Sequence, residues 1–406
     1  MIKQYIKREH YLDRIKPFIQ KNIIKVLVGQ RRVGKSYLLF QIMDELLSSG
    51  IKNEGIIYIN KELHEFESIR DYNDLLQYIK QVTRGKKAAL FIDEIQGISR
   101  FENALRDFHA SGKYDIYCTG SNADLLSGEL ASYLSGRYIE LHVYSLTYSE
   151  FMLFHKLNNS EDTFLKYLKY GGLPYLINLE LEDTIVYDYL KSITDTIMFK
   201  DVVARYKIRN IAFLERLLEY LADNVGSLVS AKKISDFLKS QKTNISPNVV
   251  LNYLHFLSTA FLIFKVQRSE IGGKKIFEIN EKYYFQDCGL RHSLIDYRLS
   301  DINKMLENIV YMHLRAAGYA ITVGQLGNKE IDFVCERKGD KLYVQVAYLI
   351  PDKKAWDREF GNLLKIQDNY PKFVVSMDKM IDAGEKGVRH LNILDFLAIP
   401  PGNPLS

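Results

Sequence analysis

Residues 29–36 read Gly-Gln-Arg-Arg-Val-Gly-Lys-Ser (GQRRVGKS) and fit the phosphate-binding pattern GxxxxGK[ST]. The run Ile23–Val28 before this loop is rich in β-branched residues and predicts a strand. Apolar residues at helical spacing after it predict a helix over residues 36–47. A loop between a strand and a helix is the context in which this pattern cradles phosphates.

Each part of the loop has a physical task in holding a nucleoside triphosphate. Its glycines let backbone N–H groups gather around a phosphate, and the helix start adds a positive dipole end. Lys35 supplies charge for the β- and γ-phosphate oxygens, and the Ser36 hydroxyl is expected to coordinate Mg²⁺. We therefore expect ATP and Mg²⁺ as cofactors. The expected nucleotide contacts are Gly29, Gln30, Arg31, Arg32, Val33, Gly34, Lys35, Ser36 and Tyr37.

A second acidic element follows the apolar run Ala88–Ile92, which predicts a strand. Asp93 ends this strand and is expected to reach the Mg²⁺ shell, while Glu94 is expected to act as general base on the attacking water. The alternative is a surface Asp-Glu pair at the start of a helix. Five apolar residues before the pair favour the first interpretation.

A further predicted strand, Asp115–Thr119, runs into the small polar residues Ser121 and Asn122. In a parallel sheet the end of this strand is expected beside the Mg²⁺-binding strand, near the γ-phosphate. Ser121 or Asn122 would then orient the attacking water. An ordinary helix N-cap is the alternative for both residues.

Arg137 precedes the predicted strand Tyr138–Val143 and is another catalytic candidate. An arginine there would stabilise charge in the transition state, either in cis or across a subunit contact. A structural salt bridge is the alternative.

Length and composition predict two or three globular domains. The chain has 406 residues, of which 47% are hydrophobic, so it can bury more than one core. Its three cysteines are widely spaced and lack metal-site spacing, which predicts free thiols in a reducing cytoplasm. The N-terminus has no signal-peptide core, and no run of 18 apolar residues would span a membrane. Residues 1–36 hold ten Lys or Arg against two acids, which suits an anionic partner or a solvated basic surface.

Patterns along the chain predict three domains. Alternating strands and helices predict an α/β domain with a parallel sheet over residues 1–150. Residues 151–298 read as helices followed by two strand-like runs, which predicts a winged-helix arrangement. Residues 299–406 begin with a helix at 305–317, and predicted strands at 321–323, 331–337 and 341–348 make them a small α/β domain.

Several motifs besides the loop make the chain resemble a large prokaryotic group of predicted AAA ATPases. They are Arg8-Glu-His-Tyr-Leu-Asp, LFIDEIQ at 90–96, TGSNADLLS at 119–127, GRYIELHVYSLTYSEF at 136–151, YGGLPYL at 170–176 and KYYFQDCGLR at 282–291. The resemblance covers nearly the whole chain. It implies a P-loop AAA parallel sheet with helices on both faces, a winged-helix middle and a restriction-endonuclease-like C-terminal domain of unknown function. It implies no defined substrate, since members of this group are mostly uncharacterised.

The C-terminal domain is expected to be a degenerate nuclease. Nucleases of the implied fold need an acid, then Asp, then Glu-X-Lys on the next strand, to hold a metal and a water. Glu307, Asp332 and Gln345 occupy the first three positions, but Ala347 replaces the lysine. We therefore expect little or no nuclease activity, and packing and partner recognition as the leading interpretation.

The third helix of the expected winged helix, Ser246–Leu257, would read a DNA groove. It offers Asn248, Asn252 and His255 but no Arg or Lys. Phosphate contacts would come from Lys232, Lys233, Lys239 and Lys242. The alternative is that the winged helix only connects domains.

Together these patterns predict a Mg²⁺-dependent ATPase whose nucleotide state sets the arrangement of the winged-helix and C-terminal domains and their unknown protein partner. One alternative is a nucleotide-gated binding module with little turnover. Another is an ATP-regulated DNA-binding protein or nuclease. The sequence leaves the oligomeric state open.

Overall fold

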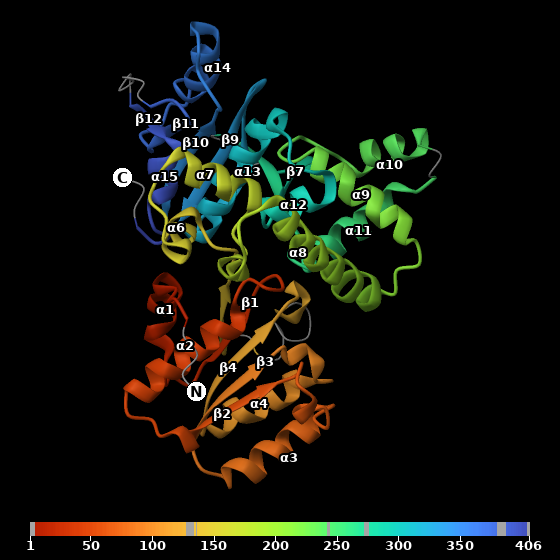
Figure 1. The fold of residues 1–406 in the computed structure, drawn as a ribbon, viewed down its shortest axis with the longest axis vertical. Coiled ribbons are helices and arrows are strands. Elements are labelled where there is room, and N and C mark those ends of the chain that lie inside the picture. Colours follow the sequence, from red (N-terminus) through yellow and green to blue (C-terminus); the bar gives the residue numbers. More distant parts are fainter. Residues whose placement is uncertain are drawn as a thin grey trace. The chain divides into compact units, whose positions relative to one another are not determined.

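The computed structural model describes residues 5–126, 134, 136–241, 244–271, 276–379 and 387–403, and Lys242 lies outside them. Two compact units divide the chain (Figure 1). The first comprises Met1–Tyr144 with Thr259–Phe261, and the second comprises Ser145–Ser258 with Leu262–Ser406. The described part of the chain contains no helix with the length and hydropathy that a membrane span requires.

The first unit is built on a five-stranded sheet in the order β2-β3-β4-β1-β5. All four strand pairings are parallel, which confirms the predicted α/β class with a parallel sheet. The strands are β1 (Ile24–Val28), β2 (Ile56–Asn60), β3 (Ala88–Asp93), β4 (Tyr114–Gly120) and β5 (Tyr138–His142). All five residues of β1 are buried, as expected for a central strand covered on both faces.

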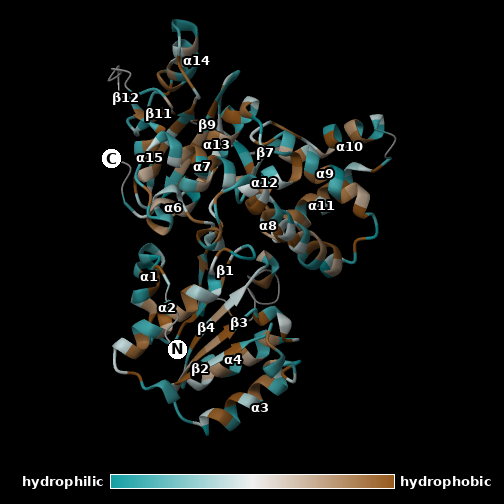
Figure 2. Cartoon of the chain, in the orientation of Figure 1, coloured by the Kyte–Doolittle hydropathy of each residue, from teal (hydrophilic) through white to brown (hydrophobic). Residues whose placement is uncertain are grey.

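Helices cover both faces of this sheet. The pair α1 (Glu9–Ile15) and α2 (Lys35–Ser48) and the pair α3 (Tyr72–Thr83) and α4 (Phe101–Ser111) lie on opposite sides of it (Figure 1). Right-handed crossovers between parallel strands require this arrangement, because the chain reverses its direction across the sheet after β2. Figure 2 shows α3 and α4 alternating between teal and brown, as expected for helices that bury one apolar face.

The second unit contains a seven-stranded sheet in the order β12-β11-β10-β9-β8-β6-β7. The hairpin predicted for the winged helix is β6 (Ile263–Glu270) with β7 (Ile276–Phe285), paired antiparallel. β6 also pairs in parallel with β8, so this hairpin continues the C-terminal sheet. The remaining strands are β8 (Ala320–Leu326), β9 (Lys329–Arg337), β10 (Asp340–Val346), β11 (Lys372–Ser376) and β12 (Val388–Asn392).

The helices of the second unit gather in two groups along the chain. The segment before the sheet contains α6 (Tyr148–His155), α7 (Glu161–Tyr170), α8 (Asp183–Thr196), a π-helix (Ile197–Ala204), α9 (Ile211–Asp223), α10 (Ala231–Ser240) and α11 (Pro247–Thr259). Within and after the sheet come α12 (Cys288–Ile295), α13 (Ile302–Ala316), α14 (Lys353–Leu363) and α15 (Ile393–Ala398). Ser230 caps α10 by accepting from the Lys233 N–H at 3.2 Å, as its position in the sequence predicts.

Two of the motifs that carry the family resemblance meet inside the second unit. The buried Asp287 accepts hydrogen bonds from the Gly172 N–H at 2.8 Å and the Leu290 N–H at 3.2 Å. A Cβ at Gly171 would lie 2.0 Å from the Asp287 carboxylate, so no side chain fits there. The motifs YGGLPYL and KYYFQDCGLR therefore form one packed junction.

Candidate functional site

The loop Gly29–Lys35 turns from the end of β1 into α2. The Gly29 N–H donates to the Gly120 carbonyl at 3.3 Å, and a Cβ on Gly29 would lie 2.2 Å from the Val143 carbonyl oxygen. Gly34 has φ 95°, a left-handed conformation that favours glycine, and it precedes the first residue of α2. Backbone of this kind at the start of a helix makes a concave cradle of N–H groups for an anion.

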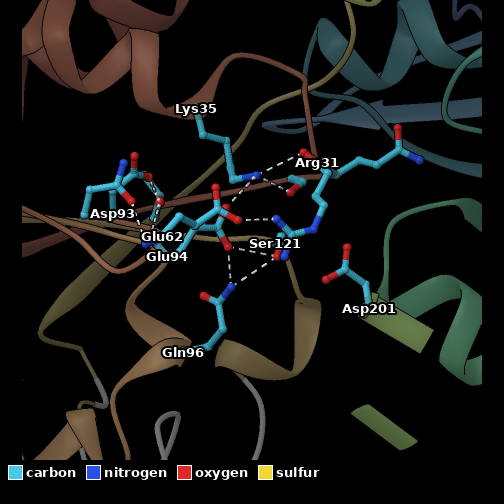
Figure 3. A network of polar contacts seen from close by, with 12 residues as sticks. Arg31, Lys35, Glu62, Asp93, Glu94, Gln96, Ser121 and Asp201 are labelled. Carbon is cyan, nitrogen blue, oxygen red and sulfur yellow. Dashed lines mark hydrogen bonds and ion pairs between the residues drawn. The ribbon is translucent and has the colours of Figure 1, made fainter. Parts of the chain in front are cut away.

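Lys35 lies folded over this loop with only 5% of its surface exposed. Its ammonium group donates to the carbonyls of Gly29 at 2.9 Å and Gln30 at 3.0 Å (Figure 3). The same Nζ atom lies 3.6 Å from Oε1 of Glu94. The structure therefore brings the loop lysine and the expected general base together.

Arg8 supports the loop and was not among the expected site residues. Its guanidinium is buried and donates to the carbonyls of Val33 at 3.1 Å and Tyr144 at 2.9 Å. The only sequence signal for it was its place in the motif Arg8-Glu-His-Tyr-Leu-Asp. Because these contacts join residues 25 and 136 positions apart, spacing alone does not reveal them.

Asp93 is buried at the end of β3 and is held from both neighbouring strands. Tyr58 of β2 donates to its Oδ2 at 3.0 Å, and Thr119 of β4 donates to its Oδ1 at 2.5 Å. Ser36, the other expected magnesium ligand, lies in the first turn of α2. A carboxylate, a hydroxyl and a glycine cradle are the donor set that Mg²⁺ with a nucleotide phosphate requires, so these residues fit that group.

Glu94 follows β3 in a left-handed conformation, with φ 54°. Its N–H donates to Thr119 Oγ1 at 2.9 Å, and its Oε2 accepts from Ser121 Oγ at 3.0 Å and from Gln96 Nε2. Burial opposes ionisation of the carboxyl, but the charges of Lys35 and Arg31 and the two side-chain hydrogen bonds outweigh burial. The pKa of Glu94 therefore lies below its ordinary value, and the group is an anion at neutral pH.

Ser121 and Asn122 have different surroundings. Ser121 contacts Glu94 and Gln96, because β4 lies beside β3 as predicted. Asn122 turns its side-chain oxygen to the Asp124 N–H at 2.6 Å, at the start of the short helix Ala123–Leu126. Asn122 thus makes the contact expected of a helix cap, and Ser121 contacts Glu94, the expected general base.

The other loop residues are arranged around the cradle in three ways. Gln30 and Val33 are buried, and neither polar atom of the Gln30 amide has a hydrogen-bond partner among the described residues. Arg31 pairs with Glu62 at 2.7 Å. Arg32 and Tyr37 are exposed, which leaves both side chains accessible to a bound molecule.

Arg137 lies at the N-terminal ends of the parallel strands, whereas the loop lies at their C-terminal ends. Its carbonyl accepts from the Ile24 N–H at 2.9 Å, and Tyr138 is in register with Ile24 at the start of β1. The loop leaves the other end of β1, five residues and about 16 Å further on at 3.3 Å per residue. In this position Arg137 does not reach a phosphate held by the loop of its own chain.

The three residues of the expected degenerate nuclease site gather in the second unit around a lysine. Lys282 of β7, 4% exposed at its side chain, lies 2.8 Å from Glu307, 2.9 Å from Glu330 and 3.8 Å from Asp332. Gln345 Oε1 accepts from the Asp332 N–H at 3.3 Å. The surrounding carboxylates outweigh burial and raise the pKa of Lys282 above its ordinary value.

Lys282 places its ammonium group among the acids where a nuclease would need a metal ion. Gln345 also donates to Glu359 at 3.0 Å, which uses its amide within the protein. Across the described residues no group of three or more His, Cys, Asp or Glu side chains is arranged to hold a metal ion. The only sequence signal for Lys282 was its place at the start of the motif KYYFQDCGLR, in a segment assigned to the winged-helix domain rather than to the C-terminal one.

The polar residues expected on the reader helix are exposed on α11. Asn248, Asn252 and His255 all face solvent, and so do Lys232, Lys233 and Lys239 of α10. A second basic stretch precedes α9, where Lys207 and Arg209 are exposed. The ring of Tyr206 stacks on Phe256 with centroids 4.0 Å apart, which places this stretch beside α11.

Comparisons with known proteins identify the family of the first unit's fold. Residues 21–152 match the family described as AAA domain, and residues 161–301 match a domain of unknown function, DUF8612. The fold resembles the Walker-type ATPase PABY2304 of Pyrococcus abyssi, with a TM-score of 0.51, 16% identity, and coverage of 71% of this chain and 96% of that one. The first unit therefore has the fold of an AAA-type P-loop ATPase, which supports nucleotide binding.

Two relatives match most of the chain. An uncharacterized protein of Haemophilus influenzae is 37% identical over 405 residues, which cover 98% of this chain and 100% of the relative. The uncharacterized protein MJ1544 of Methanocaldococcus jannaschii is 32% identical over 344 residues, which cover 80% of this chain and 75% of the relative. The chain belongs to the protein family of these two relatives.

Proposed function

We propose that this protein binds ATP with Mg²⁺ and hydrolyses it. The observation that carries the proposal is the placement of Glu94, an anion held by Ser121 and Gln96 within 3.6 Å of the loop lysine. A fixed carboxylate beside a phosphate cradle is the arrangement that takes a proton from an attacking water.

Each residue of the site has a role in this proposal. The backbone N–H groups of Gly29–Lys35 hold the phosphates, and the Lys35 ammonium exchanges the carbonyls of Gly29 and Gln30 for phosphate oxygens. Asp93 and Ser36 would hold Mg²⁺, which supplies positive charge to the β- and γ-phosphates. Glu94 accepts the proton of the attacking water, and Ser121 keeps the carboxylate oriented.

The test is steady-state phosphate release by the full chain with Mg·ATP, compared with release by Lys35→Ala and Glu94→Gln. We expect turnover in the wild type and its loss in both variants. Tight binding without turnover in the wild type would favour the alternative of a nucleotide-gated binding module. Absence of both binding and turnover would remove the proposal altogether.

We further propose that nucleotide state controls the arrangement of the second unit and of a protein partner. The chain passes between the two compact units near residue 145 and again near residues 259–262. Changes around the loop therefore have two covalent routes to the second unit. Hydrogen exchange of Glu94→Gln with ATP and with ADP tests this control, since equal protection of residues 145–258 in both states would contradict it. The same variant, which holds ATP, is the bait for the unknown partner.

A second candidate function is DNA binding through the winged-helix segment. Exposed Lys232, Lys233 and Lys239 on α10 and exposed Lys207 and Arg209 beside α11 supply positive charge for phosphates. The test is fluorescence anisotropy with duplex DNA at several salt concentrations. Replacing Lys232 and Lys233 by glutamate is expected to weaken binding and reduce the salt dependence, whereas Lys353→Glu on α14 serves as the matched control.

For the C-terminal strands we propose packing and partner recognition rather than DNA cleavage. The cation of Lys282 already pairs with Glu307 and lies 3.8 Å from Asp332, and Ala347 offers no basic group. DNA incubated with the protein and Mg²⁺ or Mn²⁺ is expected to stay intact. Cleavage that disappears in Asp332→Ala would overturn this interpretation.

A further inference from the structure

Gln96 lies two residues after Glu94, in the short 3-10 helix Ile95–Gly97 that follows β3. Its Nε2 donates to Glu94 Oε2 and to Ser121 Oγ, the latter at 3.1 Å, and Ser121 Oγ donates to the same Glu94 oxygen at 3.0 Å. These three side chains form a closed triangle of hydrogen bonds (Figure 3). The triangle joins the end of β3 to the end of β4.

The backbone around the triangle leaves little other room for Gln96. A Cβ on Gly120 would lie 3.1 Å from Gln96 Oε1 and 2.6 Å from a methyl group of Leu125. The left-handed conformation of Glu94 turns the chain so that residue 96 meets residue 94. A side chain at residue 120 would therefore displace Leu125 and press on the Gln96 amide.

The direction of the amide is set by the carboxylate. Gln96 Oε1 is buried and has no hydrogen-bond partner within the described part of the chain, which is a costly arrangement. If the amide were turned round, this oxygen would face the negative Oε2 of Glu94. The contact with Glu94 thus determines how Gln96 lies.

We propose that Gln96 is a positioning residue. It holds the Glu94 carboxylate and the Ser121 hydroxyl together while the Lys35 ammonium group binds the substrate phosphates. This inference rests on the proposed ATP hydrolysis at the same site. Lys35 attracts Glu94 from the loop side at 3.6 Å, and phosphate oxygens compete for that ammonium group. Once the lysine turns to the phosphates, Gln96 and Ser121 keep the carboxylate at the end of β3.

The experiment compares wild type, Gln96→Ala, Ser121→Ala and the double variant, with Gln77→Ala at an exposed position of α3 as control. We expect Gln96→Ala to lower kcat by about 10- to 100-fold, less than the roughly 100- to 10,000-fold contribution of a general base itself, with KM and the Kd for Mg·ADP nearly unchanged. The acid limb of the kcat profile should move to higher pH, because Glu94 loses a donor. The double variant should lose less than the product of the two single losses, since the three groups act together.

The alternative, that Gln96 only stabilises the turn after β3, predicts a different result. Gln96→Ala would then lower the melting temperature and leave the pH profile of kcat where it was, and that outcome would overturn the inference. If the wild type shows no turnover, the proposed hydrolysis fails by itself. The positioning role of Gln96 is then tested by measuring the pKa of Glu94 in the full chain by NMR. The protein carries ¹³C-labelled glutamate, and the Glu94 signal is assigned as the one that is missing in Glu94→Gln. A pKa of Glu94 that rises in Gln96→Ala supports the inference, and an unchanged pKa overturns it.

Discussion

The ammonium group of Lys35 lies 3.6 Å from Oε1 of Glu94, although β4 separates the strands that lead to these two residues. The pair forms because the loop after β1 folds across the end of β4 and Glu94 leaves β3 in a left-handed turn. Both charges are largely buried, so their interaction is screened little by salt. A phosphate that binds Lys35 would therefore also change the surroundings of Glu94, the proposed general base.

Replacing Lys35 by alanine removes the charge that this link requires. We expect the Kd for Mg·ATP to rise roughly 100-fold, or about 3 kcal/mol, the upper range for hydrogen bonds to a charged group. Titration calorimetry measures it, with the exposed Lys52→Ala as control for the loss of one positive charge. Equal affinities in the two variants would mean that nucleotide is held elsewhere.

Replacing Glu94 by glutamine keeps the shape of the side chain but removes the base. We expect nucleotide affinity to persist while kcat falls by about 100- to 10,000-fold, the usual contribution of a general base. Because the pKa of Glu94 is below its ordinary value, the wild type should stay active down to mildly acidic pH and lose activity only as the carboxylate is protonated. Phosphate release across pH measures both effects, and Glu54→Gln, at an exposed position, is the control. Retained turnover in Glu94→Gln would assign the base elsewhere.

Much of the first unit could be predicted from the sequence. The apolar runs before the loop and before Asp93 predicted β1 and β3 within one residue, because buried parallel strands need continuous apolar residues. The order of β4 beside β3 was also predicted, and it brings Ser121 to Glu94. Polar residues that meet at the ends of strands can be predicted from a sequence when the strands themselves are clearly predicted.

The contacts of Arg8 and Lys282 were not predicted, since no local pattern encodes them. Arg8 reaches Val33 and Tyr144 through the packing of α1, and Lys282 reaches Glu307 only because β7 lies at one edge of the seven-stranded sheet. The position of Arg137 likewise depends on the register of β5 against β1. Such features require the tertiary fold, which spacing alone does not supply.

The register of Arg137 leads to a prediction about subunits. Arg137 lies at the N-terminal ends of the parallel strands, and the loop lies at their C-terminal ends. Arg137→Ala should therefore leave kcat of dilute, monomeric protein within about twofold. Turnover of wild type and variant is measured together with their mass by light scattering. If kcat rises with assembly in the wild type and not in Arg137→Ala, the arginine acts on a neighbouring subunit. A tenfold loss in the monomer would contradict the observed position.

Lys282 is expected to stabilise the second unit, because it is the cation among three carboxylates. Lys282→Met leaves Glu307, Glu330 and Asp332 close together, and removing one partner of a buried ion pair costs about 3–5 kcal/mol. Burial and the charge of Glu307 raise the pKa of Asp332, and Lys282 opposes that rise. Without the lysine the stability of the variant should therefore fall as pH rises from about 5 to 8. Scanning calorimetry at both pH values measures it. Lys265→Met, which loses a half-exposed pair with Glu281, should melt close to wild type, and equal melting of the two variants would contradict the role of Lys282.

His313 on α13 gives the second unit a sensitivity to acid. Neither ring nitrogen has a hydrogen-bond partner among the described residues, the ring packs against Phe396 with centroids 5.1 Å apart, and burial lowers the pKa to about 4. The unfolded chain, with an ordinary histidine pKa near 6.5, binds the proton more tightly between these two values. Stability should therefore fall as pH drops from about 6.5 to 4, by on the order of 3 kcal/mol from this residue.

His313→Leu should remove this part of the acid sensitivity and leave the protein as stable as the wild type or more stable at pH 7, because a buried polar group without a partner is lost. Melting temperatures at pH 7 and pH 5 measure the difference, and His255→Leu at an exposed position of α11 is the control. The stabilisation by His313→Leu relative to wild type should be larger at pH 5 than at pH 7. An equal effect at both pH values would show that His313 keeps its ordinary proton affinity in the folded protein.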